Sequence, residues 1–179
     1  DRIGEMINQI YLHVKLPSLK EYAYEDQDGN LISYYWVNAI GHAMIKYVEI
    51  EIGDVVVDRQ YGLWMEIWSE LTIDASKRSA FNSLIGKCDT PINLNNDEAL
   101  NLYVPLQFWF CKNIGLSLPL VALQYNELWI NVTFRPINEW FTIRDVMDYT
   151  NNFPVISPNF NQYYMQFYRF LQTPPDEEL

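Results

Sequence analysis

The chain has 179 residues, of which 49% are hydrophobic and 16% aromatic, and its formal net charge is −11. This length is enough for one domain with its own core, and the hydrophobic content excludes an intrinsically disordered chain. The acidic charge argues against a nucleic-acid partner, and no apolar run approaches the ~18 residues of a direct membrane span.

The first third of the chain is predicted to form β-strands. Residues 10–16 alternate strictly between apolar and polar side chains, which is typical of a strand with one buried face. A second strand is predicted at residues 31–37. Residues 45–52 alternate again, and Gly53-Asp54 is a two-residue hairpin signal that returns the chain into residues 55–57.

The spacing of apolar residues changes after residue 60. Four of them follow the i, i+3, i+4, i+7 pattern of a short amphipathic helix: Trp64, Ile67, Trp68 and Leu71. A second helix is predicted from an N-cap at Asp74 to a stop at Gly86.

Strands are predicted to resume after a polar loop at residues 88–98. The later strands are residues 102–110, 128–135 and 163–171. Pro105 lacks an amide donor, so it should lie at a sheet edge or a bulge. Residues 136–161 show no firm periodicity and are interpreted as a long loop, with one helical turn from Arg144 to Tyr149.

About seven strands with long connections predict an all-β fold. The most common form with large loops is an antiparallel jelly-roll sandwich, here with long loop insertions and one or two short helices. Loops at the end of such a rigid sandwich usually carry the function.

Three stretches of the chain resemble a known family. They are WVNAIGHAMI (residues 36–45) leading into VEIEIG (48–53), YGLWMEIWSELT (61–72) followed by ASKRS (75–79), and LYVPLQFWFC (102–111) followed by LPLVALQYNE (118–127). In this order they resemble the major capsid protein of the nucleocytoplasmic large DNA viruses. The resemblance covers roughly residues 5–135, with a looser match at residues 167–179.

The resemblance implies a structural role. Members of that family have two tandem jelly rolls, and three copies form a pseudo-hexagonal capsomer that tiles an icosahedral shell. This chain resembles the first jelly roll only, so residues 1–173 are expected to form that domain and residues 174–179 a connector to a second one. The implied partners are a homotrimer, neighbouring capsomers and minor capsid proteins. The implied location is the virion, after assembly in the host cytoplasm.

Enzymatic alternatives are weak, and no catalytic residue is predicted. Glu49 and Glu51 alternate on one strand face, as paired acids do in β-sandwich glycosidases. The simpler interpretation is that both carboxylates lie on the solvent-exposed outer face of the strand and keep it soluble.

No cofactor-binding or metal-binding residue is predicted either. His13 and His42 with Glu49 would be needed for a cupin-like metal triad, but no H-x-H pair is present and His42 follows Gly41 in an apparent surface turn. The run from Asp26 to Asn30 lacks the glycine that a calcium loop requires at its sixth position. Cys88 and Cys111 are expected to be free thiols.

Three aromatic residues are the candidate interface residues: Tyr103, Trp109 and Trp129. Each falls on the strand face opposite a clear apolar core row. Outward aromatic side chains favour an interface with a second jelly roll or a neighbouring subunit, because Trp and Tyr are enriched at interface cores. The alternative is a carbohydrate-binding jelly-roll module that stacks sugars on the same rings.

Overall fold

The computed structural model describes residues 4–18, 24–25, 31–32, 34–88, 99–123, 125–144 and 155–157. The strands are β1 (Met6–Ile7), β2 (Tyr11–Leu16), β3 (Tyr24–Glu25), β4 (Leu31–Ile32), β5 (Tyr34–Trp36), β6 (Ile45–Ile52), β7 (Val55–Tyr61), β8 (Leu100–Pro105), β9 (Leu118–Pro119), β10 (Leu128–Phe134), β11 (Phe141–Arg144) and β12 (Val155–Ile156). The α-helices are α1 (Ile40–Ala43), α2 (Gly62–Thr72) and α3 (Ala75–Ile85).

One sheet of the molecule has the strand order β10-β6-β7, with antiparallel pairs on both sides of β6. The hairpin between β6 and β7 turns at Gly53 and Asp54, which both have positive φ, as a tight two-residue turn requires. The sequence prediction of β6 and of this turn is therefore confirmed. β7 is longer than predicted and runs to Tyr61.

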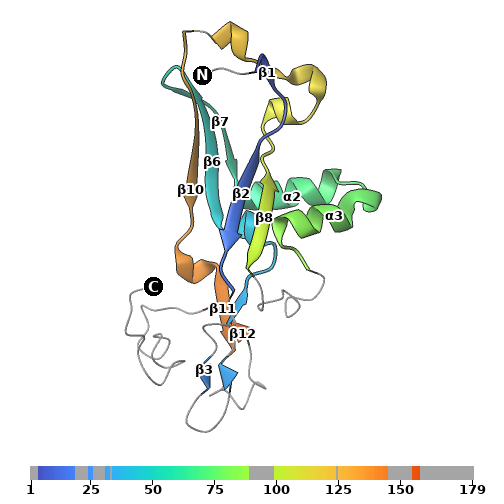
Figure 1. Cartoon of the computed structure of the whole chain (residues 1–179), viewed down its shortest axis with the longest axis vertical. Coiled ribbons are helices and arrows are strands. Elements are labelled where there is room, and N and C mark those ends of the chain that lie inside the picture. The colour runs from blue at the N-terminus through green and yellow to red at the C-terminus, as the bar shows by residue number, and fades with distance from the viewer. Residues whose placement is uncertain are drawn as a thin grey trace.

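A second sheet pairs β2 with β8 in antiparallel register, with Leu12 opposite Val104 and His13 opposite Tyr103. β8 ends at Pro105 and pairs with β2 alone among the described strands. This position suits proline, because proline has no amide N–H to donate to a second neighbouring strand. The inward rows of the two sheets meet in a single hydrophobic core that includes Ile50 of β6 and Leu102 of β8. Figure 1 shows the two sheets side by side along the long axis of the molecule.

The helices cover one side of this sandwich. α3 contacts β8, and α2 contacts both β6 and β7 (Figure 1). α3 ends at Gly86, whose φ of 68° is the left-handed conformation of a helix C-cap. Asn38 then fixes Cys88, two residues after Gly86, because its side chain both donates to Cys88 O and accepts from Cys88 N, each at 2.9 Å.

Several local predictions are wrong. Residues 136–144 are not loop throughout, since β11 pairs with β5 and with β12 in a small three-stranded sheet. Arg144 is the last residue of β11. The strand predicted at residues 102–110 stops at Pro105, and Trp109–Cys111 form a 3-10 turn.

Other predictions fall outside the described residues. They are the Asp26–Asn30 turn, most of the proposed turn at residues 144–149, the last strand at residues 163–171 and the connector at residues 174–179. Within the described part of the chain, none of the helices has the length and apolar character needed to cross a membrane.

Candidate assembly interface

The outer face of α2 is apolar and exposed. Four side chains make up this face, which we call the α2 face: Leu63, Trp64, Ile67 and Leu71. Between 44% and 74% of each side chain is exposed. Three of the four, Trp64, Ile67 and Leu71, belong to the apolar stripe from which the helix was predicted, and Leu63 lies beside it. The helix is confirmed, and much of its apolar stripe faces outward.

The opposite side of α2 is packed onto the domain. Gly62, Met65 and Ser69 are the buried residues of the helix. Gly62 is required there because a Cβ at this position would collide with the backbone carbonyls of His42 and Ile45. α2 therefore approaches α1 through its smallest residue and leaves its larger apolar side chains outside.

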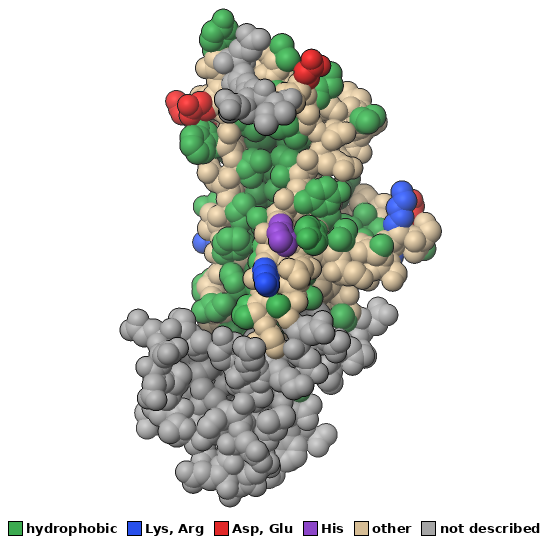
Figure 2. Space-filling view, viewed as in Figure 1, with side chains coloured by type: hydrophobic (Ala, Val, Ile, Leu, Met, Phe, Trp, Pro, Cys, Tyr) green, Lys and Arg blue, Asp and Glu red, His purple; other side chains and the backbone are tan. Residues whose placement is uncertain are grey.

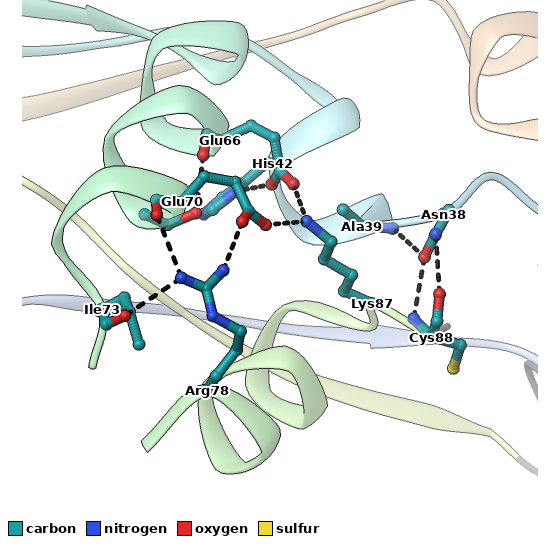
Figure 3. Close-up of polar contacts among 10 residues, drawn as sticks. Asn38, Ala39, His42, Glu66, Glu70, Ile73, Arg78, Lys87 and Cys88 are labelled. Carbon is teal, nitrogen blue, oxygen red and sulfur yellow. Dashed lines mark hydrogen bonds and ion pairs between the residues drawn. The ribbon is translucent and has the colours of Figure 1, made fainter. Parts of the chain in front are cut away.

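A network of charged groups also binds α2 to its neighbours (Figure 3). His42 Nδ1 donates to Glu66 Oε2 at 2.7 Å, and Lys87 Nζ donates to Glu66 Oε1 at 2.6 Å. Lys87 also bonds to Glu70, which in turn pairs with Arg78 of α3. Since these ion pairs join α1, α2 and α3, they hold the α2 face in one orientation.

The pKa values of the acidic groups in this network are lowered by their partners. The hydrogen bond from His42, with a further contribution from Lys87, lowers the pKa of Glu66 to about 2 against the opposing effect of burial. The bond from Lys87 also lowers the pKa of Glu70. Burial works to lower the pKa of Lys87, but its bonds to the two glutamates raise it overall. The three groups are thus charged together near neutral pH.

His42 is not a surface residue, contrary to the sequence interpretation. It lies in α1, is 2% exposed, and its ring is 6.0 Å from that of Phe81. His13 lies elsewhere, exposed on β2, where it stacks on Tyr103 at 4.5 Å. Among the described residues, no three His, Cys, Asp or Glu side chains are grouped to hold a metal ion.

Glu49 also differs from its predicted environment. Only 8% of the residue is exposed, although it was expected on the solvent-exposed face of β6. Arg59 of β7 covers it with an ion pair and lies over the ring of Tyr47 at 5.0 Å. The burial is therefore local, beneath a cross-strand arginine. Glu51, as expected, is more open and accepts a bond from Asn131 at 3.1 Å.

Two of the three predicted interface residues do point away from the core. Tyr103 is 45% exposed on β8 and Trp129 is 54% exposed on β10. They do not form one patch, because they lie on the outer faces of the two different sheets, with the core between them.

Trp109 occupies a different environment. It lies in the 3-10 turn after β8 and is half-buried against the hydrophobic core. Its ring meets Phe110 edge-on, with 5.0 Å between centroids and an interplanar angle of 90°. This geometry is that of a residue that supports the domain itself.

The sequence interpretation therefore missed the α2 face as an exposed surface. The signal was present, because the i, i+3, i+4, i+7 stripe was recognised. The hydrophobic pattern does not say whether the stripe packs within the domain or against another one.

Comparison with known proteins identifies the family. Residues 1–169 match the family model described as "Major capsid protein N-terminus". The chain is 44% identical over 144 residues to "Probable capsid protein 4" of Acanthamoeba polyphaga mimivirus, covering 78% of the chain and 27% of that protein. It is 35% identical over 162 residues to the major capsid protein of Phaeocystis pouchetii virus, covering 77% of the chain and 30% of that protein.

Solved structures show the same fold. The chain matches PBCV-1 VP54, in a crystal structure fitted into a reconstruction of the virophage Sputnik, with a TM-score of 0.59 and 24% identity. The match covers 75% of the chain and 29% of that protein. A quasi-atomic model of the PBCV-1 capsid gives a TM-score of 0.57 at the same identity, covering 75% of the chain and 29% of that protein. The all-β, jelly-roll prediction is thereby confirmed.

The chain spans between 22% and 32% of the length of curated relatives that it matches. Its family consists of structural proteins of virus capsids and not of enzymes. The chain belongs to the major capsid protein family of the nucleocytoplasmic large DNA viruses, within which it corresponds to the N-terminal region.

Proposed function

We propose that this domain builds the shell of an icosahedral virus as part of a trimeric, pseudo-hexagonal capsomer. The domain's role is to present surfaces for adhesion to the rest of its own polypeptide, to two further copies and to neighbouring capsomers. Minor capsid proteins are further proposed partners, and the virion is the proposed location, after assembly in the host cytoplasm.

The observation that carries this proposal is the α2 face. A helix normally turns its apolar stripe inward, whereas α2 is attached through Gly62 and an ion-pair network and holds Trp64 and Ile67 outward. An ordered apolar patch that the domain itself does not cover is characteristic of a protein–protein contact surface.

The outer-face aromatic residues Tyr103 and Trp129 are proposed as additional contacts. Because they lie on opposite sheets, one domain presents at least two separate surfaces, as a subunit with several neighbours requires. The family match favours this function over the carbohydrate-binding alternative.

The test is the oligomeric state of the full-length protein, measured by analytical ultracentrifugation. We expect a trimer for the unchanged protein, and a shift toward monomer for Ile67→Ser with the melting temperature preserved. The matched control is Val55→Ser, which shortens another exposed β-branched residue at the tip of the β6–β7 hairpin. A monomeric full-length protein, or equal effects of the two substitutions, would contradict the proposal.

A further inference from the structure

One end of the sandwich is apolar and exposed. Three segments build this surface, which we call the hairpin end: residues 4–7, the β6–β7 turn with its flanking residues 51–57, and residues 113–123 and 125–128 between β8 and β10. Figure 1 shows these segments together at the top of the molecule, far from β11 and β12. Between 56% and 97% of each of its most exposed apolar residues is accessible: Met6, Val55, Ile114, Val121 and Tyr125.

Backbone hydrogen bonds hold the three segments of the hairpin end together. The amide of Leu120 donates to the carbonyl of Glu5 at 2.8 Å, beside the antiparallel pair of β1 and β9. The amide of Gly53, in the hairpin turn, donates to the carbonyl of Glu127 at 3.0 Å. The exposed side chains therefore stand on a bonded backbone. A surface that is ordered before binding loses less conformational entropy when a partner covers it.

The hairpin end carries acidic residues without basic ones. No lysine or arginine occurs among the described residues 4–7, 51–57, 113–123 and 125–128. Figure 2 shows acidic side chains beside hydrophobic ones at this end, and the basic side chains of the face in view lie lower on the molecule. The acidic residues of the three segments are Glu5, Glu51, Asp54 and Glu127.

Neutral groups bond to two of these carboxylates and leave their charge in place. Trp129 Nε1 donates to Glu127 Oε2 at 3.2 Å, and Asn131 Nδ2 donates to Glu51 Oε2 at 3.1 Å. Glu5 and Asp54 are exposed. The hairpin end thus presents exposed apolar side chains within a group of negative charges.

The sign of this charge separates two kinds of partner for an exposed apolar surface. A lipid leaflet is negatively charged where it carries anionic headgroups, so the carboxylates of the hairpin end repel it. A polypeptide segment with apolar and basic side chains is attracted, because its lysines and arginines complement the carboxylates while its apolar side chains cover Ile114 and Val121. An amphipathic helix is the simplest segment that provides both.

We propose that the hairpin end is a docking site for a basic, amphipathic segment of a separate protein. Within the function proposed above, on which this identification of the partner rests, that protein is a minor capsid protein. The site is distinct from the α2 face, which lies along the side of the sandwich and shares no residue with the hairpin end (Figure 1). Failure to form trimers and failure to dock are therefore separate results.

Fluorescence anisotropy of a labelled synthetic peptide tests the site. The peptide contains only leucine and lysine, in an amphipathic helical pattern of about 14 residues, and it is titrated with the full-length polypeptide. We expect saturable binding of one peptide per chain, which weakens as the salt concentration is raised. Sedimentation of the same samples reports the oligomeric state, so docking is measured whether or not trimers form.

Two matched pairs of substitutions make the test specific. Ile114→Ser and Glu127→Gln should each raise the dissociation constant about five- to tenfold, because one removes an apolar contact and the other a charge. Ile137→Ser and Glu139→Gln should leave it unchanged. These two control residues are also exposed, in the 3-10 turn Ile137–Glu139 that follows the other end of β10.

Several results would overturn the proposal. One is the absence of binding, and another is equal weakening by the control substitutions, which would show unspecific attraction to an acidic protein. Equal binding of a leucine–glutamate peptide would show that charge does not select the partner. Binding to the 179-residue chain but not to the full-length polypeptide would show that the polypeptide covers this end itself. Binding to phosphatidylcholine vesicles that Ile114→Ser abolishes would assign the hairpin end to a membrane.

Discussion

Glu66 of α2 accepts a hydrogen bond from the buried His42 of α1, with 2.7 Å between Glu66 Oε2 and His42 Nδ1. Lys87 bonds to the other oxygen of the same carboxylate at 2.6 Å. One carboxylate thus joins α1 to α2 and to the residue that follows α3, and α2 is the helix whose apolar face is exposed.

The first prediction concerns the acid stability of this junction. The pKa of Glu66 is lowered from 4.5 to about 2 in the folded protein. The contribution of this carboxylate to the free energy of unfolding is therefore complete above about pH 4.5 and is lost as the pH falls toward 2. Glu66→Gln should therefore cost about 2 kcal/mol of unfolding free energy at pH 7 and much less at pH 3. Chemical denaturation at both pH values measures this. Glu5→Gln, at an exposed carboxylate, is the control, and a loss that does not depend on pH would contradict the assignment.

The second prediction concerns the close approach of α2 to α1. Gly62→Ala should destabilise the domain by about 1–3 kcal/mol, because the new Cβ meets the carbonyls of His42 and Ile45 and backbone must move. Gly4→Ala provides the control, since no atom lies within 4 Å of the added Cβ. Thermal melting of the two variants should separate them, and equal melting temperatures would show that α2 is not packed in this way.

The third prediction separates interface aromatics from core aromatics. Trp129→Ser should weaken assembly of the full-length protein and spare its melting temperature, because the ring is exposed on the outer face of β10. Covering such a ring contributes about 2 kcal/mol at roughly 25 cal/mol per Å². Tyr103→Ser should behave in the same way, with some effect on stability because its ring stacks on His13.

Trp109→Ser is the contrasting variant. Since Trp109 packs on Phe110 and on the core, its loss should lower the melting temperature before any effect on assembly is seen. Sedimentation and melting measured on the same samples give both readouts. If Trp109→Ser left stability unchanged, its assignment to the core would be wrong.

The fourth prediction concerns the thiols. Cys88 and Cys111 are both free, and burial raises the pKa of Cys111. A raised pKa leaves less thiolate, so alkylation of Cys111 at pH 8 should be slower than that of a fully exposed cysteine in a short peptide. Intact mass under non-reducing conditions should show no loss of two hydrogens. Peptide mapping after brief alkylation would give the rate at each site.

Much of the fold could be read from local patterns in the sequence. The period-2 alternation of residues 45–52 defines β6 to the residue, and Gly53-Asp54 marks its turn. The boundaries of α3 follow from Asp74 and Gly86. These features were predictable because they depend on backbone conformation and on side chains only a few positions apart.

Short or ambiguous segments were not predictable in the same way. β11 and β12 contain four and two residues, too few to establish a period. Residues 106–110 do alternate in burial, but they form no strand: residues 106–108 have no regular structure and Trp109–Cys111 form a 3-10 turn.

The sequence by itself determined that the chain is all-β, which family it resembles and where α2 lies. Only the tertiary structure decided which side of α2 is covered. The amphipathic stripe through Trp64 and Ile67 indicates a surface that excludes water, but it carries no information about which surface covers it. That choice depends on the collision that only Gly62 avoids and on the hydrogen bonds of Glu66 with His42 and Lys87, which join residues more than 20 positions apart.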